Sequence, residues 1–319
     1  MVNYQKINEY SAWLFIVLSV LCIAGISYTY YQQKNLSLIS TENTINIKTT
    51  NNSEQKIAEN ENKKSTQGMA LNTSTNYPWH INIRATTFWV GEIFNERVSD
   101  GSQVCSTYDK DWAYDYSNIN TYKIPETSIA CPGSIAGGCD GVWEHNNGIK
   151  TCSTELRSKD NDYFPTKIIP KENPFYVALP YDDVNDEKGF DERCKNIPWA
   201  FDHEYSGHCT DPHFSYLKNR WVEIIGPHNA TCFGQIEDAG PSHDELYHDA
   251  SYVFGNTNAQ PVQQYFNNAG LDMSPALTSC VGFADIDGEG ERVKWRFVQN
   301  KDVLDGPWKH IITTRQVQL

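Results

Sequence analysis

The chain has 319 residues and is 39% hydrophobic, and its nine Trp, 18 Tyr and 13 Phe side chains can fill a sizeable core. Its formal net charge is -14, and Lys and Arg form no cluster, which argues against nucleic acid as a partner because phosphate binding needs clustered cations. The acidity is typical of a solvated, soluble surface, or of a protein that prefers neutral or cationic ligands.

The first predicted element is a membrane helix over residues 12–31, AWLFIVLSVLCIAGISYTYY, in a stretch without charge between Glu9 and Lys34. About 20 apolar residues are enough to span a bilayer. A cleaved signal peptide would have a shorter apolar region and a small-residue cleavage site, and ISYTYYQQ offers no good one. We therefore expect residues 1–11 to be a cytoplasmic tail and residues 12–31 to be an uncleaved signal anchor.

The next segment, residues 32–77, is rich in Asn, Thr, Ser, Lys, Glu and Gln. Such a composition cannot bury a core, so it predicts a disordered polar linker. Order is expected to resume near Trp79, and residues 78–319 are predicted to form one extracytoplasmic domain. The expected protein is thus a single-pass membrane protein whose C-terminal domain is periplasmic or extracellular.

The cysteines support this orientation. Cys22 lies in the predicted span, and an even number of cysteines follows it, which indicates four disulfides in an oxidising compartment. Zinc is the alternative, but no C-x-x-C pair is present. Proximity in sequence suggests the pairs Cys131–Cys139 and Cys194–Cys209, and the other pairings stay open. The eight cysteines are Cys105, Cys131, Cys139, Cys152, Cys194, Cys209, Cys232 and Cys280.

Short strands separated by turns are predicted for the domain, because β-branched and aromatic residues recur in short alternating runs. These runs are HINIRATTFWV, NPFYVALPYDD, the hairpin RWVEIIGPHNATCFGQIED with its turn GPHNA, and RVKWRFV. One short helix is expected after Asp272, at MSPALTSCVG. Asp272 or Ser274 can cap it, Pro275 suits its first turn, and Gly282 can end it.

Two phrases, EDAGP with Asp238 and GLDMSPA with Asp272, each place an aspartate at the edge of an ordered segment. The Gly-Pro step turns the chain at a strand end, and Asp272 lies where a strand passes into the helix. Two carboxylates facing one groove are the arrangement that glycosidic cleavage needs, provided that one carboxyl stays protonated through a raised pKa. The alternative is structural: Asp272 caps the helix and Asp238 holds the turn.

The hairpin, the strand ending in Asp-x-Gly-Pro and the Leu-Asp-x-Ser-x-Ala helix start together resemble the rare lipoprotein A group. More broadly, they resemble the barwin, expansin and family 45 endoglucanase set. The resemblance is best over residues 222–282, and TTFWVGE and FYVALPYDD are similar to the opening and middle strands. It implies a mainly β fold, a six-stranded double-psi β-barrel with long loop insertions and a short helix.

The same resemblance implies a cell-envelope protein that cleaves glycan, with peptidoglycan as the expected partner and a lytic transglycosylase or glycosidase activity that uses a rim Asp as general acid/base. Two positions depart from the lytic family: Ala239 stands where that family has Arg, and FYVALP lacks its His. The alternative is therefore a non-catalytic, membrane-tethered barrel that binds glycan or an envelope protein.

The predicted catalytic residues are Asp272, Asp238 and Asp183, since Asp182 and Asp183 follow the middle strand and either can supply a second carboxylate. Glu92 follows the first strand through VGE and is a further candidate at the substrate. The aromatic rings expected to stack on sugars are those of Trp89, Trp112 and Tyr181.

No cofactor or metal is expected. His243, Asp244 and His248 lie in the insertion between the two phrases; metal binding is the alternative for them, and a polar surface loop is the expected role. The segment DIDGEGE lacks the glutamate of a calcium loop, because that position is Arg296.

Overall fold

The computed structural model describes residues 77–92, 103–119, 122–123, 135–136, 138–146, 149–242, 246–286 and 291–319. All of them fall in one compact unit. Within these ranges, no helix has both the length and the apolar character needed to cross a membrane. The predicted membrane helix lies outside the described residues, as does the predicted linker apart from Tyr77.

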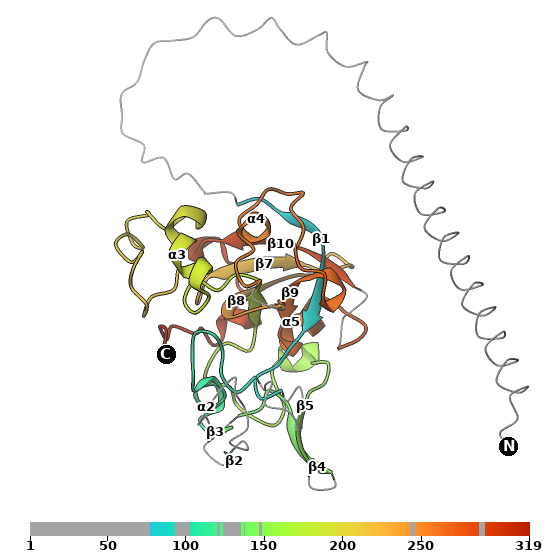
Figure 1. Ribbon diagram of the computed structural model, residues 1–319. Coiled ribbons are helices and arrows are strands. Elements are labelled where there is room, and N and C mark those ends of the chain that lie inside the picture. Colours follow the sequence, from blue (N-terminus) through green and yellow to red (C-terminus); the bar gives the residue numbers. More distant parts are fainter. Residues whose placement is uncertain are drawn as a thin grey trace, which may run out of the picture. The chain divides into compact units, whose positions relative to one another are not determined.

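Six strands close into a barrel (Figure 1). β1 runs parallel to β9 and β6 runs parallel to β8, while the other four neighbouring pairs are antiparallel. Closure leaves no free sheet edge in the barrel. In spatial order the strands are β1 (His80–Thr87), β10 (Arg292–Val298), β7 (Trp221–Ile225), β8 (Thr231–Ala239), β6 (Tyr176–Leu179) and β9 (Ala269–Met273).

This architecture confirms the prediction of a mainly β domain, and each predicted run contains a strand. The hairpin of β7 and β8 is present with Val222 opposite Gly234 and Ile225 opposite Thr231, on either side of the GPHNA turn. Alternation decides which side chains enter the barrel, because successive residues of a strand point to opposite faces.

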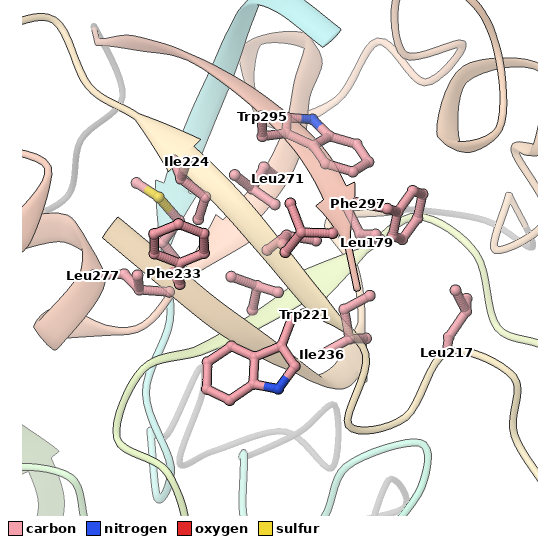
Figure 2. Packing of buried hydrophobic residues seen from close by; sticks show 14 of the residues in the cluster. Leu179, Leu217, Trp221, Ile224, Phe233, Ile236, Leu271, Leu277, Trp295 and Phe297 are labelled. Carbon is pink, nitrogen blue, oxygen red and sulfur yellow. The ribbon is translucent and has the colours of Figure 1, made fainter. Parts of the chain in front are cut away.

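The barrel interior is a continuous apolar core. Each strand of the barrel contributes buried aliphatic or aromatic side chains to it, and Figure 2 shows Leu179, Ile224, Ile236, Leu271 and Trp295 converging there. All five are fully buried. Complete burial of one such side chain stabilises the fold by about 1.5–3 kcal/mol, so this core is the main source of stability.

A second, smaller core forms against the outer face of β6. Helix α2 (Trp112–Ser117) packs its Trp112 and Tyr116 rings onto Tyr176 of β6, and Phe88 joins them. Figure 1 places α2 and the short strands at one end of the barrel. Those strands are β2 (Tyr122–Lys123), β3 (Ile135–Ala136), β4 (Val142–Asn146) and β5 (Ile149–Ser153).

The other helices are short. The prediction of a helix after Asp272 is confirmed, but its N-cap is Ser274, whose Oγ accepts a hydrogen bond from the backbone N–H of Leu277 at 3.2 Å. Asp272 itself lies in β9 and does not cap the helix. The helical elements are α3 (Glu187–Asn196), α4 (Ala250–Val253), α5 (Pro275–Cys280) and the 3-10 turns Lys159–Asn161, Phe266–Asn268, Asn300–Asp302 and Pro307–Lys309.

Three disulfides join described residues: Cys139–Cys152, Cys194–Cys209 and Cys232–Cys280. Cys105 is also disulfide-bonded. The predicted pair Cys194–Cys209 is confirmed. The predicted pair Cys131–Cys139 is wrong, because the β4–β5 hairpin folds back and brings Cys152 to within 6.0 Å of Cys139, measured between Cα atoms.

Removing the disulfide that joins β8 to α5 is expected to lower stability strongly. It spans 48 residues, and closing a loop between 15 and 100 residues contributes roughly 3–4.7 kcal/mol in the chain-entropy model. The double variant Cys232→Ala with Cys280→Ala should lose more unfolding free energy in urea than Cys194→Ala with Cys209→Ala, whose loop spans 15 residues. An equal or larger loss for the shorter loop would contradict this expectation.

Candidate active site

Asp272, Ala178 and Asp238 form one row across three neighbouring strands. Ala178 of β6 pairs with Asp272 of β9 on one side and with Asp238 of β8 on the other. Thr86 of β1 extends the row beyond Asp272. Adjacent strands are about 4.8 Å apart, so the two aspartate backbones are about 10 Å apart, with only the methyl group of Ala178 between them. Directly paired residues point to the same face of a sheet, so the row brings both carboxylates together.

The row lies on the outer face of the barrel. Val177 and Leu179 flank Ala178 and belong to the interior core, and Leu271 and Met273 flank Asp272 in the same way. Ala178 instead packs in the second core, with Val90 and Trp112. The carboxylates therefore face the layer that residues 88–92 and 103–117 build on the barrel.

A β-bulge turns Asp238 to this face. Val177 pairs with Ile236 while the next residue, Ala178, pairs with Asp238, so Glu237 is an extra residue in β8. In a regular strand without the bulge, Asp238 would point into the barrel interior as Ile236 does, since side chains two residues apart point the same way. Bulges re-aim side chains in this manner, often beside active sites.

Asp238 is almost fully buried but well hydrogen-bonded. Its carboxylate accepts from the backbone N–H groups of Thr107 at 2.8 Å and Ala239 at 2.9 Å, and from the side-chain amide of Gln103. Burial raises the pKa of Asp238 to about 7; the backbone hydrogen bonds and Lys218 lower it, and Asp182 raises it further. Asp238 therefore titrates near neutrality and can act as either proton acceptor or donor.

Asp272 is half-buried and accepts a hydrogen bond from the hydroxyl of Thr86. Burial is the main cause that raises its pKa to about 8, and the charge of Asp238 adds to the effect. Its Oδ2 closely faces Gly240, where an added Cβ would lie 3.3 Å away and where φ is +155°. The glycine of the Asp-Ala-Gly-Pro phrase thus places backbone without a side chain next to the carboxyl of Asp272. Because the two groups interact, their apparent pKa values belong to the pair.

Asp182 and Tyr247 complete the cluster. Asp182 accepts from the hydroxyl of Thr107, the residue whose N–H also bonds Asp238. Burial raises the pKa of Asp182 and of Tyr247, and the Tyr247 phenol also feels the charges of Asp238, Asp272 and Asp182. Three carboxyls and one phenol therefore share a small volume. No sequence pattern marked Tyr247, Thr107 or Thr86, because each reaches the site through long-range packing.

Asp183 lies elsewhere. It is fully buried, and its two oxygens accept from Ser215 Oγ and from the backbone N–H of Tyr216, each at 2.6 Å. Burial raises its pKa to about 6. Because Asp183 is fully buried, substrate and water have no access to it. Asp182, and not the predicted Asp183, is the carboxylate of this pair that lies beside Asp238.

The three aromatic rings predicted to stack on sugars differ in burial. Trp112 is 1% exposed and Tyr181 is 0% exposed, so neither offers a face to a sugar, and their prediction as substrate contacts is corrected. Both rings are needed inside the protein, Trp112 against Phe88 and Tyr181 against Phe254. Trp89 is half-buried, and its indole N–H donates to the carbonyl oxygen of Cys152 at 2.9 Å.

Glu92 closes a turn beside Trp89. Its carboxylate lies 3.4 Å from the backbone nitrogen of Trp89, and the two residues also share a backbone hydrogen bond of 2.9 Å. Glu92 and Trp89 therefore stay candidates for contact with substrate. His243 and Asp244 lie outside the described residues. Over the described ranges, no group of three or more His, Cys, Asp or Glu side chains is arranged to hold a metal ion.

The donors and acceptors at the row can hold and transfer a proton. One acid that stays protonated near neutral pH lies beside a second that can ionise, and the two are fixed by Thr86, Thr107 and Gln103. Groups whose environments move their pKa values toward neutrality are a frequent mark of catalytic sites. Comparison of the sequence with models of known protein families and with curated proteins finds no match to any of them.

Proposed function

We propose that this protein cleaves glycosidic bonds in a cell-envelope glycan, with Asp272 as the general acid. The observation that carries the proposal is the row of Asp272, Ala178 and Asp238, in which burial raises the pKa of Asp272 to about 8. A carboxyl that stays protonated near neutral pH can donate its proton to the leaving glycosidic oxygen.

Two mechanisms fit this geometry. In hydrolysis, Asp272 protonates the glycosidic oxygen while ionised Asp238 takes a proton from the attacking water. Inverting hydrolases hold their carboxyls about 6.5–9.5 Å apart to leave room for that water, whereas retaining enzymes hold them about 5 Å apart. In lytic cleavage, Asp272 donates the proton and its carboxylate then accepts one from a sugar hydroxyl, which closes an anhydro ring.

The barrel supports an assignment to the double-psi group. Two parallel pairs, β1 with β9 and β6 with β8, interrupt an otherwise antiparallel closed barrel of six strands. The disulfides suit an oxidising compartment. With the apolar run at residues 12–31, they support a protein anchored in the inner membrane, with its barrel in the periplasm or outside and peptidoglycan as substrate.

The second candidate function is a non-catalytic barrel that binds glycan or an envelope protein. Ala178 and Ala239 favour it, because neither supplies an imidazole or a cation beside the two carboxyls. On this alternative, protonated Asp272 and Asp238 would be hydrogen-bonding groups for sugar hydroxyls, and no product would form.

The pH dependence of fragment release tests the first function. If Asp238 must be ionised and Asp272 protonated, kcat/KM should be bell-shaped, rising near pH about 7 and falling near pH about 8. The variant Asp238→Asn should lose the acidic limb of the profile. Initial rates of soluble fragment release from peptidoglycan would be measured across this range. A rate that falls as pH rises through about 5 would contradict the role of Asp272, because its proton would then be lost far below neutral pH.

A further inference from the structure

A cavity of about 520 Å³ is lined by residues of α3, of α4 and of the segments that flank α4. Its lining includes Asn196, His248, Val262 and Gln263. The volume lies within the range of about 300–1,000 Å³ that small-molecule sites occupy. Nothing in the proposed cleavage chemistry uses this cavity.

Gln263 gives the cavity an unsatisfied acceptor. Its side chain is 2% exposed, and its amide N–H donates to the carbonyl oxygen of Ala269, which fixes the orientation of the amide. Its Oε1 has no hydrogen-bond partner among the described residues. Buried acceptors are nearly always paired, so Gln263 keeps an unused hydrogen-bonding capacity in the wall of the cavity.

His248 gives the cavity a fixed imidazole. Its Nδ1 lies 3.1 Å from the carboxylate of Asp186, the residue that caps the N-terminus of α3. This contact orients the ring and leaves Nε2 without a hydrogen bond to the described parts of the chain. Asn196, nearby on α3, uses only its Nδ2 in long contacts of 3.3 Å to Tyr181 and 3.4 Å to Glu192.

The chemistry of the lining selects an uncharged, hydroxyl- and amide-bearing ligand. The cavity is bordered by one cation, Lys188, and by two carboxylates, those of Glu192 and Asp249, so the charge of its lining does not favour an anion. The exposed side chain of Val262 and the half-buried side chain of Leu246 supply an apolar surface beside the polar groups. A sugar ring has such a combination of hydroxyl edges and an apolar face, and an N-acetyl group adds an amide.

The cavity shares a wall with the carboxylate row. The backbone N–H of Asp182 donates to the carbonyl oxygen of Tyr247 at 2.7 Å, and the N–H of Asp249 donates to that of Pro180 at 3.0 Å. Segment 246–249 is thus held along the residues that follow β6. Tyr247 faces the carboxyls, while Leu246 and His248 line the cavity.

We propose that this cavity is a second saccharide-binding site, specific for an uncharged N-acetylated sugar, which holds the glycan next to the row that cleaves it. The choice of ligand rests on the proposed function, whereas the existence of a binding site rests on the cavity itself. Substrate held there would stay close to Asp272 after one bond is cut.

Calorimetric binding of N-acetylglucosamine oligosaccharides tests this site. Asp272→Asn would serve as the background, so that no probe is cut during the titration. In that background, Val262→Trp should fill the cavity mouth and weaken affinity at least about tenfold. Leu304→Trp is the matched control, because Leu304 is 64% exposed where Val262 is 58% exposed, and it lies outside the cavity. Melting curves would confirm that both variants fold.

Weakened binding in Val262→Trp with unchanged binding in Leu304→Trp would support the site. Equal affinity in the two variants, or no binding by any of them, would overturn it. The cleavage proposal has a different negative outcome. If the protein binds the probe through the cavity but wild type releases no fragments, the binding site is supported and the catalytic role of Asp272 is not.

Discussion

Replacing Asp272 by Asn is expected to lower fragment release from glycan by about 10²–10⁴-fold, the usual cost of losing a general acid. Asn keeps the size of the side chain and can still accept from Thr86, but it carries no proton to donate. The loss should appear in kcat and not only in KM, because proton donation occurs in the transition state. Fragment release under saturating glycan is the measurement.

Asp272→Asn should not lower the stability of the fold, and its stability relative to wild type should increase with pH. The pKa of Asp272 is raised from 3.8 to about 8 by folding, so its favourable contribution is complete below pH 3.8 and is lost as pH rises through about 8. Asn does not ionise and escapes this loss. Melting temperature should therefore rise relative to wild type between pH about 4 and about 8.

Asp183→Asn is the matched control for the chemical change, because Asp183 is buried but lies away from the row. It should lower the melting temperature while retaining cleavage, since one of its two donors, Ser215 or the Tyr216 N–H, loses an acceptor. An Asp272→Asn variant that releases as much product as wild type would remove Asp272 from catalysis.

Arg193→Met is expected to cost about 3–5 kcal/mol of unfolding free energy, the range for disrupting a buried charge and its partners. The Arg193 guanidinium is fully buried and donates to five backbone carbonyl oxygens. Met fills similar space but removes all five donated hydrogen bonds, and only backbone N–H groups at 3.1 and 3.3 Å then remain, for two of the five described acceptors. The carbonyls belong to Asp183, His208, Cys209, Asp211 and Phe214, at 2.5–3.1 Å.

Urea denaturation would measure this loss, with Arg292→Met as the control. Arg292 is exposed and makes one hydrogen bond of 2.8 Å, to the carbonyl oxygen of Asn82, so its replacement should change stability by less than about 0.5 kcal/mol. Equal effects of the two replacements would mean that the loop around Arg193 is held by its Cys194–Cys209 disulfide instead.

The barrel strands and the β7–β8 hairpin could be predicted because their signals are local. Alternation over RVKWRFV and the turn residues of GPHNA each act within a few positions. The Cys194–Cys209 pair was predictable for the same reason, since only 15 residues separate the two cysteines. Cys139 lay nearer to Cys131 in sequence, but strand pairing in β4–β5 decided its partner.

The candidate site could be predicted only in part. Asp272 and Asp238 stood out because Gly-Pro and Ser-Pro mark the ends of their strands. The bulge at Glu237 left no local signal in the sequence, and the partner of Glu237 in a buried ion pair of 2.9 Å is Lys218, a residue on another segment. The choice between Asp182 and Asp183 also depended on distant partners, Thr107 for one and Ser215 for the other.

The sugar-stacking roles of Trp112 and Tyr181 were wrongly predicted for a related reason. Nothing in the sequence distinguishes a ring that packs between a helix and a strand from one that faces solvent. Trp112 and Tyr181 became buried because α2 and α4 cover β6 and the segment that follows it. Trp89, with the same residue type and a similar context, stayed half-exposed because it lies at a turn.

The most direct test of the glycan-cleaving function is mass analysis of what wild-type protein releases from purified peptidoglycan sacculi. If the protein cleaves glycan, we expect soluble sugar fragments. They should carry an anhydro end if the sugar's own hydroxyl attacks and a reducing end if water attacks. Their amount should fall about 10²–10⁴-fold in Asp272→Asn and stay near the wild-type level in Asp183→Asn. Sacculi that bind the wild-type protein and release no fragments would contradict the account and leave the non-catalytic barrel.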